Sequence, residues 1–211
     1  MVKNLIIAGA VGFAREVLLY ATEIMIEKKG FVIKGFIDDD LHALDERKYE
    51  YKILDTIDNY KICKDDVFIC ARGDVHIKKK ICEVLIKKGA SFVNLIHPTA
   101  KVGHTSTLGV GNIIAPYSIL TQDVKIGNFV TINAYSSCGH DVEIGDFCTI
   151  SAHCDITGYA KLEESVFLGS NATICPKVTV RKNARIGAGS VVIKNIRENV
   201  VVFGNPAKEV F

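Results

Sequence analysis

The sequence contains no tryptophan, and its 211 residues include only four prolines and two methionines. It also lacks an apolar run of the roughly 18 residues that a membrane-spanning helix needs. Lysine and arginine number 26 against 24 aspartates and glutamates, so the net charge is only +2. A protein dedicated to nucleic acid would show a basic excess. These absences exclude a membrane-spanning helix and a nucleic-acid binder, and they leave an ordinary globular protein.

The seven cysteines form no C-x-x-C pair, and an odd number is a poor basis for a disulfide framework. We therefore expect buried, reduced thiols, because free cysteine behaves as a small core residue. No cysteine or histidine pair has the spacing of zinc ligands, so we expect no metal site. The first residues, MVKNLIIAGAVG, reach a glycine turn too early for a signal peptide. Together these features predict a cytoplasmic protein.

Residues 1–96 alternate between short apolar runs and stretches with helical spacing. Buried parallel strands are expected at residues 3–8, 31–37, 67–71 and 91–96. Helices are expected at residues 14–29 and 75–88. Residues 41–64 are polar and poorly periodic, so we expect loops there with at most one short helix. The alternation of strands and helices predicts a Rossmann-like α/β domain with a parallel sheet.

From residue 101 onward the pattern changes to a strict six-residue period. Steps of six from Val102 to Val192 meet sixteen positions, of which fifteen are Leu, Ile or Val and the other is Cys138. Most of these aliphatics are followed four residues later by a small or apolar residue. That residue and the next aliphatic are two apart, so on a strand both point inward. A six-residue period is no multiple of 3.6, which excludes a helix.

Three short strands and three corners would close a triangular coil, and stacked coils would bury a column of aliphatic side chains. Sixteen hexads make a little over five such coils. Glycine directly follows the aliphatic in seven hexads, as at Gly145 and Gly169. We expect these glycines to be corner residues that ease a positive φ. Residues 97–211 are therefore predicted to form a hexapeptide-repeat parallel β-helix domain.

Five segments stand out, namely LIIAGAVGFAREV, GFIDDD, LIHPTAKVG, SSCGHDVEIGDFCTISAHCDITG and VVFGNPAKEV. They resemble the bacterial sugar acetyltransferases of the sialic-acid O-acetyltransferase and nucleotide-aminosugar N-acetyltransferase family. The resemblance covers essentially the full chain. It implies left-handed coils, acetyl-CoA as co-substrate, a nucleotide-linked amino sugar as acceptor, and a homotrimer with active sites between neighbouring prisms.

The histidine in the hexad SCGHDV is the catalytic candidate. We expect His140 at a corner with its ring outward, and the resemblance makes it the base that takes a proton from the acceptor. The resemblance also implies that Asp141 hydrogen-bonds the imidazole. Residue 158 lies one coil above residue 140, at a spacing of about 4.8 Å. The N–H of Gly158 is implied to stabilise the oxyanion of the tetrahedral intermediate.

The resemblance places acetyl-CoA along the C-terminal coils. The implied contacts are Thr149, where some relatives carry a histidine, and Gly158, Ser170, Ala188 and Lys194. His153 could face the same groove, but the resemblance carries no role to it.

The glycine turn after the first strand departs from G-x-G-x-x-G, so we do not expect NAD binding. The resemblance instead implies a sugar nucleotide at the carboxyl edge of the sheet, where ligands bind in such folds. The matching residues are Val11, Gly12, Phe13, Asp38, Asp39 and Gly73.

Our first hypothesis is an N-acetyltransferase acting on a nucleotide-linked 4-amino-deoxy sugar, with direct attack in a ternary complex and a product for surface-polysaccharide (O-antigen) synthesis. An O-acetyltransferase acting on a sugar hydroxyl, such as that of a sialic acid, would use the same residues. A zinc hydratase on this scaffold would need three converging histidines. A nucleotide-binding scaffold without catalysis would not need His140. The sequence specifies neither the nucleotide base nor the sugar.

Overall fold

The computed structural model describes residues 2–28 and 30–210. The chain forms two compact units, which meet in the sequence between Pro98 and Thr99. The expected helix at 14–29 includes Lys29, and the two expected domains include Met1 and Phe211. These three residues lie outside the described part of the chain.

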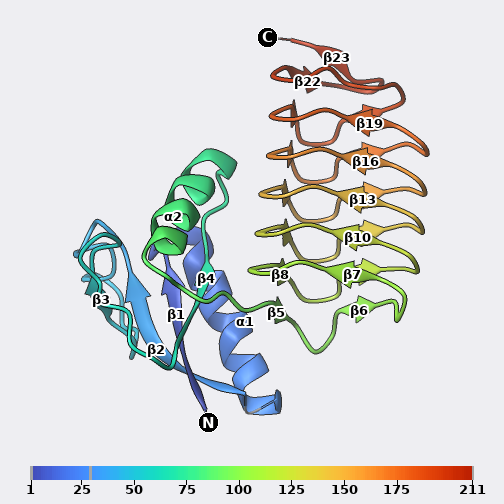
Figure 1. The fold of residues 1–211 in the computed structure, drawn as a ribbon. Helices are drawn as coiled ribbons and strands as arrows, with labels where there is room; N and C mark the ends of the chain where they lie inside the picture. Colours follow the sequence, from blue (N-terminus) through green and yellow to red (C-terminus); the bar gives the residue numbers. More distant parts are fainter. Residues whose placement is uncertain (1, 29, 211) are drawn as a thin grey trace. The chain divides into compact units, whose positions relative to one another are not determined.

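The first unit is a parallel α/β fold (Figure 1). Its strands pair in the order β3-β2-β1-β4, and every pair is parallel. The elements are β1 (Lys3–Ala8), α1 (Gly12–Lys28), β2 (Phe31–Ile37), β3 (Ile53–Asp55), β4 (Asp66–Cys70), α2 (Val75–Lys87) and β5 (Leu95–Ile96). Helix α1 packs on β1 and β2, and α2 packs on β4. All of β4 is buried, as expected for a parallel strand covered on both faces.

Two expectations for this unit are wrong. The polar segment 41–64 contains the strand β3, which pairs with β2, while the rest of the segment forms turns and loops as expected. Three residues are too few to show a hydrophobic period, so the strand left no signal. The expected strand at 91–96 is interrupted. Phe92 makes a single bridge to Phe68 of β4, and β5 covers just the last two residues of the expected strand.

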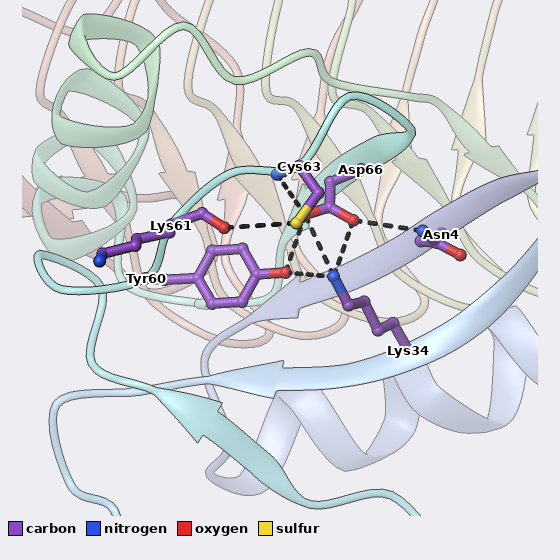
Figure 2. A network of polar contacts seen from close by, with 6 residues as sticks. All are labelled: Asn4, Lys34, Tyr60, Lys61, Cys63 and Asp66. Atoms are coloured by element: carbon purple, nitrogen blue, oxygen red, sulfur yellow. Dashed lines mark hydrogen bonds and ion pairs between the residues drawn. The ribbon is translucent and has the colours of Figure 1, made fainter.

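A buried polar cluster joins β1, β2 and β4 (Figure 2). The Asp66 carboxylate accepts hydrogen bonds from the Tyr60 hydroxyl at 2.8 Å and the Cys63 N–H at 2.8 Å. It also pairs with the Lys34 ammonium at 3.0 Å. Burial by itself would raise the pKa of Asp66, but these three donors outweigh burial and hold the pKa below its usual value. The cluster is a structural clamp whose charged groups are satisfied.

The second unit is a left-handed parallel β-helix (Figure 1). One sheet contains β6 (Lys101–Val102), β9 (Ile119–Leu120), β12 (Ser137–Cys138), β15 (Asp155–Ile156), β18 (Thr173–Ile174) and β21 (Val191–Val192). The next contains β7 (Thr107–Leu108), β10 (Lys125–Ile126), β13 (Glu143–Ile144), β16 (Lys161–Leu162) and β19 (Thr179–Val180). The third contains β8 (Ile113–Ile114), β11 (Thr131–Ile132), β14 (Thr149–Ile150), β17 (Phe167–Leu168), β20 (Arg185–Ile186), β22 (Val201–Phe203) and the antiparallel β23 (Lys208–Glu209).

Every strand from β6 to β21 ends on one of the sixteen aliphatic positions that the period predicted. Each strand from β6 to β18 pairs in register with the strand one coil later, as Cys138 does with Ile156. The aliphatics from Ile114 onward are buried, and only Val102 and Leu108 in the first coil are half-buried. The fold class and the core of this unit therefore follow directly from the hexad pattern.

The expectation about the glycines is wrong. The positive φ lies at the third residue after each aliphatic from Leu108 to Ile186, and from Tyr117 to Asn183 a residue other than glycine takes φ near +60° every six residues. The glycines directly after the aliphatics serve the stacking of coils instead. A Cβ on Gly169 would lie 2.6 Å from the Ala188 nitrogen, and one on Gly145 would lie 2.9 Å from the Glu164 nitrogen. Glycine is needed there because the next coil occupies the space of a side chain.

All seven cysteines are free. Five are buried, Cys175 is intermediate and Cys63 is exposed, so the expectation of burial fails for Cys63. Burial raises the pKa of the Cys138 thiol to about 12. Neither described helix is both long enough and apolar enough to cross a membrane.

Candidate active site

The corners of the β-helix stack into edges, and two of them carry the predicted site. We name the first the His140 edge. It consists of corner residues 122–123, 140–141, 158–159 and 176–177, with Lys194 at its upper end. We name the second the Tyr135 edge. It consists of residues 116–117, 134–135, 152–153, 170–171 and 188–189. The sheet that contains β12 separates the two edges.

His140 follows β12 with its side chain 60% exposed. Its Nδ1 lies 2.9 Å from Oδ2 of Asp141, so the shorter aspartate reaches the imidazole. An aspartate that accepts from Nδ1–H leaves Nε2 unprotonated and able to accept a proton. Asp141 takes φ of +58°, and its N–H donates to the Gln122 carbonyl of the coil below at 3.2 Å. The corner itself therefore holds the aspartate beside the ring.

Gly158 lies against the imidazole from one coil above. A Cβ there would stand 2.8 Å from both Cε1 and Nε2 of His140, so only glycine leaves the ring its place. At the same corner position, the Asn128 N–H donates to the Asp146 side chain one coil later, at 2.7 Å. The residue one coil after Gly158 is Pro176, which has no acceptor in its side chain. Among the described residues the Gly158 N–H donates no backbone hydrogen bond, so it can meet an external oxygen.

The predicted acetyl-CoA residues lie in three places. Ser170 and Ala188 are stacked on the Tyr135 edge, where the Gly189 N–H donates to the Ser170 carbonyl at 2.8 Å. Lys194 lies on the His140 edge three coils above His140, or roughly 14 Å at the spacing of stacked strands. Thr149 is only 2% exposed, in β14 of the third sheet and half a coil from His140. Within one chain these residues do not converge.

The predicted sugar-nucleotide residues meet at the carboxyl edge of the first unit's sheet. Val11, Gly12 and Phe13 follow β1, Asp38 and Asp39 follow β2, and Gly73 follows β4. Val11, Gly12 and Asp39 are exposed, while Phe13 and Gly73 are half-buried. The Asp39 carboxylate accepts from the Ile57 N–H at 3.2 Å.

Asp38 differs from this group because it is buried and already bonded. Its carboxylate accepts from the Ala10 N–H at 2.6 Å and the Asp40 N–H at 3.1 Å, and it pairs with Arg72 at 2.6 Å. These contacts hold the glycine turn against β2 and β4. Asp38 therefore supports the turn, whereas Asp39 is exposed at this edge.

Sequence reasoning missed three side chains at these places. Arg72 follows β4, and its Nε is buried without a partner among the described residues. Asn133 directly follows β11, and its Oδ1 is buried and equally unpartnered. Tyr159 packs against His140 with ring centroids 5.0 Å apart. The available signal was position. Arg72 directly precedes the predicted site residue Gly73, Asn133 directly follows β11, and Tyr159 directly follows Gly158.

Two further histidines lie away from the His140 edge. His153 stacks on Tyr135 at 5.1 Å on the Tyr135 edge, and buried His97 pairs with Glu23. Within the described ranges, no three His, Cys, Asp or Glu side chains gather where they could hold a metal ion.

Two family models match the chain. The PglD N-terminal domain matches residues 4–85, and the bacterial transferase hexapeptide (six repeats) matches residues 159–194. The curated GDP-perosamine N-acetyltransferase of Escherichia coli O157:H7 is 32% identical over 148 residues, which is 67% of this chain and 66% of that protein. The bifunctional protein GlmU of Dichelobacter nodosus (strain VCS1703A) is 31% identical over 125 residues, 51% of this chain and 27% of that protein. The chain thus spans less than two thirds of the length of these curated relatives.

Two solved structures match both units of the chain. WeeI from Acinetobacter baumannii AYE has a TM-score of 0.87 and 27% identity, covering 99% of this chain and 100% of that one. PerB from Caulobacter crescentus, solved with CoA and GDP-perosamine, has a TM-score of 0.89 and 25% identity, covering 100% of this chain and 99% of that one. The order of domains, the hexapeptide coils and these likenesses agree. The chain belongs to the proteins that join a PglD-type N-terminal domain to a hexapeptide-repeat β-helix, and it is similar to sugar acetyltransferases of that architecture.

Proposed function

We propose that this protein transfers the acetyl group of acetyl-CoA to the amine of a nucleotide-linked 4-amino-deoxy sugar. The observation that carries the proposal is the corner formed by His140, Asp141 and Gly158. It offers an imidazole oriented by a carboxylate and, directly above it, a backbone N–H that is open to an oxyanion. The similarity to a GDP-perosamine N-acetyltransferase supports an amine as the acceptor.

In the reaction the amine nitrogen attacks the thioester carbonyl, forming the C–N bond. Nε2 of His140 takes the amine proton, and the Gly158 N–H bonds the oxyanion. The C–S bond then breaks, and the imidazolium returns the proton to the sulfur of CoA. The thiol of Cys138 points into the coil interior and has a raised pKa, so it is a poor acyl carrier. Direct transfer in a ternary complex needs no such carrier.

The position of the cofactor residues supports a homotrimer. His140 and Lys194 lie on one edge of the prism, whereas Ser170 and Ala188 lie on another. One acetyl-CoA can contact both sets when it lies between the His140 edge of one copy and the Tyr135 edge of the next. A hollow lined by Lys194 and Lys208, with Ile193 and Pro206, would receive the cofactor phosphates. Thr149 would then act, if at all, from the neighbouring copy.

The sugar nucleotide would bind at the carboxyl edge of the first unit. Val11, Gly12, Phe13, Asp39 and Gly73 would contact it there, and Asp38 would hold the turn in place. Acetyl-CoA and nucleotide sugars are cytoplasmic metabolites, and free cysteines suit a reducing compartment. We therefore place the protein in the cytoplasm, at a step that supplies acetylated amino sugars for surface-polysaccharide synthesis.

The test uses purified protein, acetyl-CoA, and GDP-perosamine, dTDP-4-amino-4,6-dideoxyglucose or free sialic acid as acceptor. We expect CoA release and an acetylated amine in at least one nucleotide amino sugar. His140→Ala should lower kcat by about 10²–10⁴-fold, the usual contribution of a general base. His104→Ala is the matched control, because His104 stands at the same corner position two coils below. If sialic acid is the one acceptor that becomes acetylated, the acceptor group is a hydroxyl and the proposed amine acceptor is wrong. Full activity in His140→Ala would remove its role as base.

A further inference from the structure

Tyr159 has an unusual position among the corner residues. It directly follows Gly158, and its side chain is 49% exposed. Its ring meets the imidazole of His140 edge to face, with centroids 5.0 Å apart and planes inclined by 85°. Its own N–H donates to the His140 carbonyl at 3.1 Å, so the backbones of the two residues are also joined.

The imidazole needs such a neighbour because it projects from an exposed edge. The last torsion of a histidine side chain has broad minima and is not fixed by the backbone. The hydrogen bond from Nδ1 to Asp141 restrains one atom of the ring, and Gly158 presents no side chain to it. An aromatic ring packed perpendicular to the imidazole restrains its plane. Tyr159 supplies this third restraint.

On its other side Tyr159 borders a hollow in the surface. Asp123, Lys125, Asp141, Glu143 and Lys161 form the rest of its lining. Lys125 and Lys161 both pair with Glu143, at 3.3 and 3.0 Å. Lys125, Lys161 and Glu143 are satisfied by one another, and Asp141 already bonds Nδ1 of His140. The contact that remains for His140 on this side is the ring of Tyr159.

We infer that Tyr159 is a positioning residue that holds the His140 imidazole in the plane required for proton transfer. The inference rests on the proposed role of His140 as base. It assigns the function to the aromatic ring and none to the phenol hydroxyl, because ring-to-ring packing is the contact observed.

The decisive variants are Tyr159→Phe and Tyr159→Asn. Phenylalanine keeps the ring. Asparagine removes the ring and tolerates the corner φ of +61°, because asparagine is enriched in left-handed conformations. We expect kcat of Tyr159→Phe to stay within about twofold of the wild type. We expect kcat of Tyr159→Asn to fall about 10–100-fold, the range for a misplaced catalytic group, with KM for acetyl-CoA nearly unchanged.

Tyr117→Asn is the matched control. Tyr117 has the same corner conformation, with φ of +59°, and a similar exposure of 53%, but it stacks on Tyr135 on the other edge. Tyr117 lies at the lower end of the Tyr135 edge, three coils below Ser170, and is none of the proposed acetyl-CoA contacts. Its substitution should therefore leave kcat unaltered. A loss of kcat in Tyr117→Asn as large as that in Tyr159→Asn would overturn the inference. The loss would then result from changing a corner residue and not from removing the ring beside His140.

A second measurement needs no turnover. The ring signals of His140 are assigned by NMR in histidine-labelled protein from their absence in His140→Asn. Tyr159→Asn should shift these signals and Tyr159→Phe should largely restore them, whereas Tyr117→Asn should leave them in place. An unshifted His140 signal, or normal kcat, in Tyr159→Asn would overturn the inference while leaving the proposed function intact. If wild type acetylates no acceptor, the proposed function fails and the NMR result alone decides whether Tyr159 orients the ring.

Discussion

The imidazole of His140 fits against the next coil because Gly158 has no side chain. Gly158 lies in contact with the imidazole, and its N–H is open because Pro176 stands one coil above. The same residue therefore leaves room for the base and offers a donor for the oxyanion. Neither property requires a positive φ, since Gly158 is absent from the residues with that conformation. Contact alone makes glycine necessary at this position.

We expect Gly158→Ala to lower kcat by about 100-fold, because the added Cβ would stand 2.8 Å from Nε2 and displace the ring. The melting temperature should change little, since the displaced group is exposed. Steady-state kinetics and circular dichroism measure the two quantities. Gly30→Ala is the control, because a Cβ there meets nothing within 4 Å. A Gly158→Ala protein with wild-type kcat would show that the ring does not need this space.

At the scale of elements, the corners explain how the coils hold together. A non-glycine residue in the left-handed region costs roughly 1–2 kcal/mol. Each such corner residue donates its N–H to the coil below, as Tyr159 does to His140 and Lys177 to Gly158. Because these hydrogen bonds and the strand ladders recur in every coil, the strained conformation is held by its neighbours on both sides. The site is therefore built on a rigid edge.

The clamp around Asp66 should make the stability of the first unit depend on pH. The folded pKa of Asp66 lies below its ordinary value of about 3.9, so its contribution is complete above about pH 5 and is lost as pH falls through the folded pKa. We expect Asp66→Asn to destabilise the unit by about 2 kcal/mol at pH 7, because hydrogen bonds to a buried charge are lost. Urea unfolding followed by circular dichroism gives this difference.

The difference between wild type and Asp66→Asn should narrow between pH 5 and pH 3. Asp65→Asn is the matched neighbour, since its ion pair with Lys3 is exposed and contributes at most about 1 kcal/mol. If the difference for Asp66→Asn stays constant down to pH 3, the carboxylate is not the group that stabilises the cluster.

At the scale of the whole molecule, the proposed site is incomplete in one chain. His140 and Gly158 lie on one edge, and Ser170 and Ala188 lie on another. A symmetric assembly brings the two edges together with every copy equivalent. This arrangement makes a prediction that no monomeric site would satisfy.

Co-expression of His140→Ala with Ala188→Trp should restore activity that neither variant has alone. In randomly mixed trimers, about a quarter of the grooves combine an intact His140 edge with an intact Tyr135 edge, so about a quarter of wild-type activity should return. Acetyl transfer by the purified mixture measures it. The double variant, which carries both substitutions in one chain and is expressed alone, should remain inactive. Failure of the mixture to recover activity would place the site within one copy.

The sequence by itself determined the β-helix and the position of His140 in it. Alternation along a strand and the six-residue period are local properties, so the sixteen aliphatic positions and the corners between them could be counted directly. The first unit followed less completely. Its two helices and main strands have clear patterns, whereas β3 is too short to show one.

Only the tertiary structure decided what the residues at the corners and turns do. In the structure the positive φ lies at residues such as Asp141 and not at the glycines after the aliphatics, and Asp38 is buried in an ion pair with Arg72. The tertiary structure also placed Tyr159 on His140 and separated Ser170 from His140 by a whole sheet. The physical reason is that these properties depend on contacts between residues 18 or more positions apart, which the stacking of coils and strands creates and no local period records.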